Sequence, residues 1–280
     1  MFHAFAPYAT APYSTALYAL AALSLVLAVA LYRIIMSPNL RYHSFLYKVK
    51  AAIIFRCGKI RRLHAAPWVT WDGKEEREID LKDVREAQRF VKAGDIGLHN
   101  DWGFACNLAI PGNFKHAWIF TGGDQIIEAV QEGVLKRDAM YPLISDYVVI
   151  LRPMGVTHEE VREAVSRAES IVGSDYDANF DFDLDDEEKK FSTNLRCSKF
   201  HGAFSCTETV AFSWLRCRDK LGIFRTKHAG REAIIADDYL RMHFEVVWAS
   251  PSVTPKWLEE NGMHEEGRLK IGKFLERGKA

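Results

Sequence analysis

A cysteine and a histidine in this chain have the types and settings of a thiol nucleophile and its base. Cys206 follows Ser205 in the stretch AFSCTETV, and Glu208 lies three residues after the serine. The pattern S-x-x-E is typical of a helix capping box and puts Cys206 at the first helical position. Backbone N–H groups and the helix dipole favour a thiolate there, and the thiolate is the nucleophilic form. The pattern predicts Cys206 as the nucleophile and Ser205 as its cap.

The competing interpretation of Cys206 is a core residue, because free cysteine is among the most buried residue types. Of the other cysteines, Cys197 is predicted in a loop and Cys217 at the C-terminal end of a helix, so neither has the helix-start setting. An odd number of cysteines at irregular spacing implies no disulfide framework and fits a reducing compartment. The full set is Cys57, Cys106, Cys197, Cys206 and Cys217.

The base is predicted to be His116, which begins the apolar stretch HAWIF. A thiol nucleophile needs a nearby base, and histidine is the usual one. A three-residue loop, 121–123, pairs His116 with Glu128 on one face of a hairpin, where the carboxylate fixes the imidazole tautomer. A two-residue turn at 122–123 puts Glu128 on the opposite face instead. The Glu128 assignment therefore depends on loop length.

Hydrophobic periodicity and helix-end signals predict the helices and strands around these residues. Thr157 and Glu160 form a second capping box, and Gly173 is expected to end that helix. Residues 100–115 contain Gly, Pro and Asn without a clean period and are predicted to form a loop that could act as a lid. The mixture favours an α+β fold with a small, largely antiparallel sheet packed by helices. Helices are predicted at 77–92, 157–173 and 206–217, and strands within 93–99 and at 116–120, 124–130, 146–153 and 244–251.

The N-terminal segment has the features of a membrane anchor. It is uncharged up to Tyr32, and its apolar run over residues 15–32 is long enough to cross a hydrocarbon core. A cleaved signal peptide is the competing interpretation, but no basic residue precedes the run. Because the nearby Lys and Arg residues all follow the run, the positive-inside rule predicts a single-pass protein with its catalytic domain in the cytoplasm.

The charges divide the chain into two unlike parts. Residues 1–71 hold eight of the 37 Lys and Arg residues and none of the 37 Asp and Glu residues. The basic and apolar segment 41–64 has two open interpretations, a helix on an anionic membrane surface or a solvated linker helix. The predicted division is an anchor at 1–36, a basic juxtamembrane segment at 37–67, a catalytic domain at 68–252 and a C-terminal tail at 253–280.

Six stretches carry a resemblance to a known family. In chain order they are AGDIGL, KHAWIF, IIEAVQEGV, YVVILRP, VGSDYDANFDFD and FSCTETV. Together, over roughly residues 93–250, they resemble the permuted papain-like cysteine amidases of the YiiX/YaeF type, relatives of the NlpC-type peptidases and of lecithin:retinol acyltransferase. In that permuted branch the histidine precedes the cysteine, as it does here.

The resemblance implies a circularly permuted papain-like (NlpC-type) fold and a catalytic set of Cys206, His116 and Glu128. The chain has Thr207 where the family commonly has serine. The function expected is a membrane-anchored cysteine hydrolase that cleaves an amide or ester bond of an acylated or lipid substrate through an acyl-thioester. The alternatives are an acyltransferase or phospholipase, and a catalytically silent lipid- or peptide-binding protein. Weaker expectations of substrate contact fall on Trp102, Phe104 and Phe204.

Metal sites are not favoured by the spacing of the potential ligands. The acidic stretch around Asp177 and Asp181 lacks EF-hand spacing and is expected to be a solvated loop. Cys197 and His201, with Cys206 and Cys217, match no standard zinc spacing. The sequence therefore predicts no metal, no cofactor and no nucleic-acid partner; the expected partners are a small-molecule, lipid or acylated-peptide substrate and the membrane, reached through residues 15–36.

Overall fold

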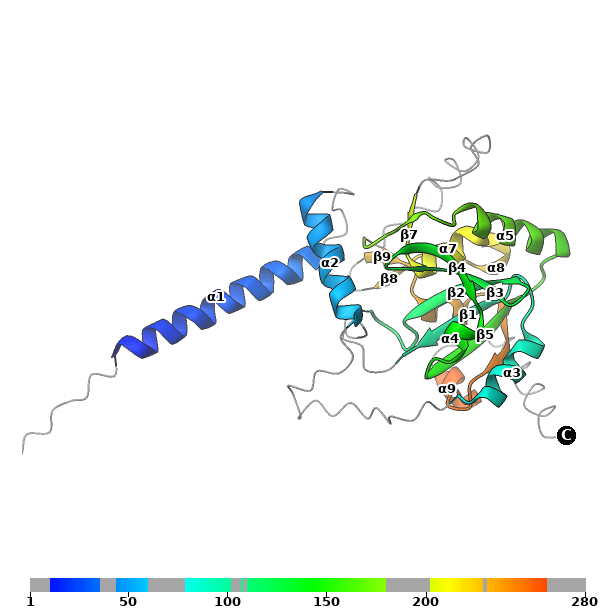
Figure 1. Ribbon diagram of the computed structural model, residues 1–280, viewed down its shortest axis with the longest axis horizontal. Coiled ribbons are helices and arrows are strands. Elements are labelled where there is room, and N and C mark those ends of the chain that lie inside the picture. Colours follow the sequence, from blue (N-terminus) through cyan, green and yellow to red (C-terminus); the bar gives the residue numbers. More distant parts are fainter. Residues whose placement is uncertain are drawn as a thin grey trace, which may run out of the picture.

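The fold is α+β, with an antiparallel sheet packed by helices, as predicted. The computed structural model describes residues 11–35, 44–59, 79–101, 107, 110–179, 202–228 and 231–260. Its centre is a six-stranded sheet in the order β10-β5-β1-β2-β3-β4 (Figure 1). All neighbouring strands of this sheet run antiparallel. The strands are β1 (Ile96–Asn100), β2 (His116–Gly122), β3 (Gln125–Val130), β4 (Gly133–Asp138), β5 (Tyr147–Pro153) and β10 (Phe244–Ala249).

Helices and two small strand pairs surround the sheet. β6 (Asp175–Tyr176) pairs in parallel with β7 (Ala203–Phe204), and β8 (Thr226–His228) pairs with β9 (Arg231–Ala233). The α-helices are α1 (Ala11–Ile35), α2 (Phe45–Lys59), α3 (Leu81–Phe90), α4 (Met140–Leu143), α5 (His158–Ser170), α7 (Cys206–Ser213), α8 (Arg218–Leu221) and α9 (Pro255–Glu260), and the 3-10 helices are η2 (Leu215–Cys217) and η3 (Ala236–Arg241).

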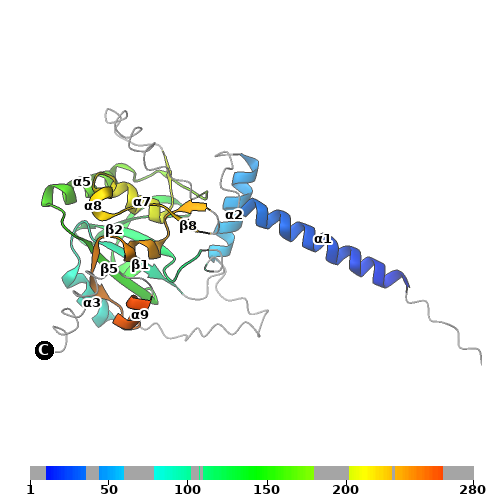
Figure 2. The same ribbon diagram turned by 180° about the vertical axis from the view of Figure 1, so that it is seen from behind.

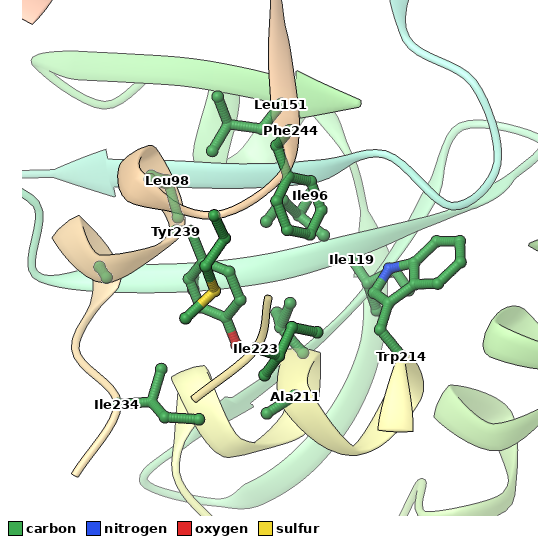
Figure 3. Packing of buried hydrophobic residues seen from close by; sticks show 14 of the residues in the cluster. Ile96, Leu98, Ile119, Leu151, Ala211, Trp214, Ile223, Ile234, Tyr239 and Phe244 are labelled. Atoms are coloured by element: carbon green, nitrogen blue, oxygen red, sulfur yellow. The ribbon is translucent and has the colours of Figure 1, made fainter. Parts of the chain in front are cut away.

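One face of the sheet packs against α5, α7 and η3. Side chains such as Ile96, Ile119 and Leu151 alternate onto this face along their strands, as the two-residue period of a strand requires. Ala211 of α7 and Tyr239 of η3 meet them in the same cluster, as Figure 3 shows. This packing sets the distance of α7 from β2 and β3. Cys206 is the first residue of α7.

The opposite face is covered by α3 and α4 and includes the buried rings of Trp118 and Trp248. Trp118 is fully buried, and its indole lies over Gly97, its cross-strand partner. A Cβ built on Gly97 would lie 1.9 Å from Cζ2 of Trp118. Gly97 is therefore required by the close approach of the ring.

Two of the stretches that carry the resemblance meet in a buried ion pair. Asp95 is almost fully buried, and its carboxylate accepts hydrogen bonds from Arg152 Nε at 2.9 Å and Nη2 at 2.7 Å. Arg152 also donates to Phe90 O at 2.6 Å, so it ties the end of α3 to β5. The ion pair joins the residue before β1 to β5, and β1 in turn pairs with β2.

Helix α2 docks onto the folded domain, an arrangement that neither interpretation of the basic segment anticipated. Tyr47 Oη donates to Tyr176 O at 3.0 Å, and buried Lys50 donates to Asn179 Oδ1 at 3.1 Å. Phe55 adds an edge-to-face contact with the Tyr176 ring at 5.6 Å. α2 therefore lies against β6, while α1 extends away from the domain in both views (Figures 1 and 2). Within the described residues, none of the helices has the length and apolarity needed to cross a bilayer.

Most predicted elements are present, with shifted ends. The Thr157–Glu160 capping box is confirmed, but α5 ends at Ser170, before Gly173. Strand β4 was not predicted, because its second half consists of the consecutive charged residues Lys136, Arg137 and Asp138. The core also includes Val253 and Leu258, so the folded part continues past the predicted boundary at residue 252.

Candidate active site

The position of Cys206 at the start of α7 is set by the local sequence. Ser205 caps α7, with its Oγ accepting from the Glu208 N–H at 3.4 Å while the Glu208 carboxylate accepts from the Ser205 N–H at 2.7 Å. Cys206 is therefore the first helical residue, as predicted, and it is 6% exposed. Its sulfur lies where unpaired helical N–H groups and the dipole stabilise negative charge.

The hairpin of β2 and β3 differs from the predicted one in its loop. The turn is the two-residue Gly123-Asp124, with φ angles of 59° and 57°, between paired Gly122 and Gln125. Such a turn alone would put Glu128 on the wrong face, but a bulge at Thr121 shifts the register by one more residue. Ile119 consequently pairs with Ile127, and continuing this register puts Glu128 across from Trp118. The predicted direct pairing of His116 with Glu128 is wrong, whereas the predicted shared face is correct.

His116 and Glu128 form a direct contact despite that offset. The His116 Nε2 lies 2.8 Å from Glu128 Oε2, and Glu128 is 2% exposed. Diagonal neighbours on one face of an antiparallel pair are within reach of long side chains. Because a carboxylate only accepts, Nε2 carries the proton and donates it, which leaves Nδ1 for the thiol. The other carboxylate oxygen lies 3.3 Å from Arg137 Nη1 on β4.

Cys206 interacts with the sheet where β2 and β3 separate. Among the described residues 116–130, pairing of these strands runs from the turn only to Ile119 and Ile127. N–H groups alternate in direction along a strand, and the Phe120 N–H donates to the β1 side. The Ala117 N–H therefore points into the gap between β2 and β3. Together with the Thr207 N–H, it interacts with the Cys206 sulfur and lowers the pKa of the thiol.

These contacts favour the charged pair of thiolate and imidazolium. Burial raises the pKa of Cys206, but the charge and hydrogen bond of His116, followed by the Ala117 and Thr207 N–H groups, outweigh burial and lower it. Burial likewise lowers the pKa of His116, but the Cys206 thiolate and then Glu128 raise it to about 10. Burial raises the pKa of Glu128, but the hydrogen bond and charge of His116, together with the charge of Arg137, outweigh burial and lower it, so Glu128 stays ionised. The arrangement therefore favours the thiolate form of Cys206 over the thiol.

His99 is a further residue of the site, and the sequence did not predict it. It lies across from His116 in the β1–β2 pairing, with ring centroids 4.7 Å apart. Burial and then the charge of His116 lower the pKa of His99 to about 3. Its Nδ1 is buried without a hydrogen-bond partner in the described part of the chain. His99 is thus a neutral ring against the imidazolium. The only sequence signal was its place at the end of a strand, and the pairing of that strand was not predictable locally.

The three residues expected to contact substrate have different outcomes. Phe204 is fully buried and packs on Phe212, with ring centroids 5.2 Å apart, so it supports the start of α7 from within the core. Trp102 and Phe104 lie outside the described residues, as do Cys197 and His201. Within the described ranges no group of three or more His, Cys, Asp or Glu side chains is placed to hold a metal ion.

Comparisons with known proteins do not assign the chain to a family. No protein-family model matches it, and no match was found among curated proteins or solved structures. The function is therefore inferred from the geometry of Cys206, His116 and Glu128.

Proposed function

We propose that this protein is a thiol hydrolase that cleaves an amide or ester bond through an acyl-thioester on Cys206. The observation that carries the proposal is the convergence of three side chains: a cysteine at a helix start, a histidine that interacts with its sulfur, and a buried glutamate 2.8 Å from Nε2 of that histidine. Nucleophile, base and orienting group are the parts that thiol acyl transfer needs.

In the proposed acylation step the Cys206 thiolate attacks the substrate carbonyl carbon and forms a C–S bond. The electron pair of the carbonyl moves to its oxygen, and the Cys206 N–H, which has no acceptor within its own helix, is the donor proposed for that oxyanion. As the tetrahedral intermediate collapses, the imidazolium of His116 gives its Nδ1 proton to the leaving amine or alkoxide. The acyl group stays on sulfur.

Deacylation repeats the chemistry with water. Neutral His116 takes a proton from water as the oxygen attacks the thioester, and the C–S bond breaks to release a carboxylic acid and restore the thiolate. Glu128 keeps the imidazole in one tautomer and stabilises its positive charge in both steps. Neutral His99 adds no competing charge at the ring.

The permuted papain-like fold is part of this proposal. It is supported by the six stretches that resemble the family and by the order of His116, Glu128 and Cys206 along the chain. The antiparallel sheet with a nucleophile-bearing helix packed over β2 and β3 is compatible with it.

The proposal is tested by hydrolysis of a panel of acyl amides and acyl esters of different chain length. We expect Cys206→Ala to abolish turnover with the fold retained, since no other group replaces the thiolate. Cys217→Ala is the matched control, because Cys217 is also buried but lies at the end of the same helical region. A folded Cys206→Ala protein with native turnover would refute the assignment.

The acceptor and the location are separate parts of the proposal. Product analysis with and without an added amine or alcohol distinguishes hydrolysis from acyl transfer, because both share the acyl-enzyme. An acylated or lipid substrate and a membrane location are supported by the apolar run at 15–32 and the basic residues after it. Fractionation of the full chain, compared with a chain that begins at Ser44, tests that location.

A further inference from the structure

Three consecutive residues of η3 hold three different parts of the molecule. Asp237, Asp238 and Tyr239 are each 7% exposed or less. Their side chains point to the loop before β2, to the β8–β9 pair and to the start of α7. Buried polar side chains need hydrogen bonds to offset the loss of water, and these three residues form theirs with three different parts of the fold.

Asp237 holds the loop that leads into β2. Its carboxylate accepts from the N–H of Asn113 and from that of Phe114, each at 2.7 Å. The loop comes so close that a Cβ on Gly112 would lie 2.8 Å from the Asp237 carboxyl carbon, and Gly112 has a φ of +89°. Phe114 is two residues before His116, so these charge-assisted hydrogen bonds set where His116 begins β2.

Tyr239 holds the start of α7. Its hydroxyl donates to Thr207 O at 2.7 Å, and the Thr207 hydroxyl donates to Ile234 O, also at 2.7 Å. Thr207 directly follows Cys206, and its N–H also acts on the sulfur. Figure 3 shows Tyr239 in the core between the sheet and α7. The position of the nucleophile is therefore fixed from the same helix as that of its base.

Asp238 anchors η3 itself. One carboxylate oxygen accepts from Ile235 N–H at 2.9 Å, from Thr226 Oγ1 at 3.0 Å and from His228 Nε2 at 2.9 Å. These contacts fasten η3 to β8, so that Asp237 and Tyr239 extend from a fixed support.

We propose that η3 sets the distance between Cys206 and His116, with Asp237 and Tyr239 as the positioning residues. Cys206 and His116 come from segments far apart in the chain, and one helical turn holds the backbone beside each. Displacements below one ångström at such a pair weaken the interaction between its charges. The inference rests on the proposed role of the pair, but its test needs no substrate.

The test is the pH dependence of alkylation of Cys206 by iodoacetamide in the full chain, followed by mass spectrometry of the Cys206 peptide. Only the thiolate reacts, so the midpoint of the profile reports the pKa of Cys206. Asp237→Asn offers one acceptor oxygen to two N–H groups, and Tyr239→Phe removes the bond to Thr207. We expect each folded variant to raise the midpoint by about half a unit to one unit, the equivalent of about one hydrogen bond.

Asp219→Asn is the matched control, because Asp219 is 99% exposed on α8, and it should keep the native midpoint. If Asp237→Asn fails to fold, Tyr239→Phe decides the test. Folded variants that keep the native midpoint would refute the positioning role of η3 while leaving the proposed function intact. A native protein whose Cys206 titrates at the ordinary thiol pKa would instead contradict the proposed function itself.

Discussion

His116 donates to Glu128 across 2.8 Å although the two residues are not cross-strand partners. The contact exists because the Thr121 bulge and the two-residue turn together shift the register by an even number of residues from a direct pairing. Thr121 Oγ1 donates to Gln125 O at 3.1 Å and helps hold the bulge. The bulge near the tip of the hairpin therefore determines that the carboxylate of Glu128 lies within hydrogen-bond distance of His116.

Replacing Glu128 by glutamine should lower kcat by roughly a hundredfold, a typical contribution of a group that orients and charges a base. The substitution keeps a hydrogen-bonding side chain of the same length but removes the negative charge that stabilises the imidazolium. Steady-state kinetics with the best substrate of the panel measures the change.

Glu132→Gln is the control for that variant. Glu132 also lies near Arg137, with an Nη2 to Oε2 distance of 3.9 Å, but it is 62% exposed and does not touch His116. Its loss should leave kcat unchanged. Equal kcat values for Glu128→Gln and the native protein would show that Glu128 is only structural.

Activity should have a bell-shaped pH dependence set by the Cys206–His116 pair. The rate rises as Cys206 loses its proton, below the ordinary thiol pKa of 9.0, because its pKa is lowered. The rate falls as the imidazolium of His116 loses its proton at a pKa of about 10. In Glu128→Gln the alkaline limb should move to lower pH, since a raising influence on the pKa of His116 is gone. A single-limbed profile with a midpoint at the ordinary pKa of either group would be incompatible with an ion pair.

Local chemistry predicted the parts of the site that depend on short stretches of chain. The Ser205–Glu208 capping box placed Cys206 at a helix start, and HAWIF placed His116 at the start of a strand. These features are set within about four residues, where capping and periodicity operate. The antiparallel sheet followed from the same local signals.

Features that depend on long-range pairing were not predictable in the same way. The register of β2 and β3 depends on a bulge that the sequence TGGD does not specify. His99 reaches His116 only through the β1–β2 pairing, and Tyr239 reaches Thr207 through the core. The docking of α2 depends on Lys50, a residue type expected in solvent, which is buried against Asn179.

Gly97→Ala should destabilise the fold by about 3 kcal/mol, at the upper end of overpacking costs. The added methyl group meets the Trp118 ring at 1.9 Å, and β1 cannot retreat because it is paired on both sides. Chemical denaturation measures the loss. Trp118→Phe in the same background should recover part of it, because the smaller ring makes room; no recovery would place the strain elsewhere.

Lys50→Met should loosen α2 from the domain with little effect on the sheet. Lys50 is fully buried and donates to Asn179, whereas Lys48 is exposed on the same helix, so Lys48→Met is the matched control. We expect faster proteolytic cleavage within residues 44–59 in Lys50→Met and native cleavage in Lys48→Met. The same cleavage rate in both variants would show that Lys50 does not hold the helix.

Cys206 is proposed to carry the acyl group, and trapping of the acyl-thioester is the sharpest test of that proposal. A thiol-reactive acyl probe is mixed with the native protein, with Cys206→Ala, with His116→Ala and with Cys217→Ala, and the modified peptide is located by mass spectrometry. We expect one acyl group on Cys206 in the native and Cys217→Ala proteins, much slower labelling in His116→Ala and none at this peptide in Cys206→Ala. Acylation at another residue, or labelling of Cys206 at the native rate without His116, would contradict it.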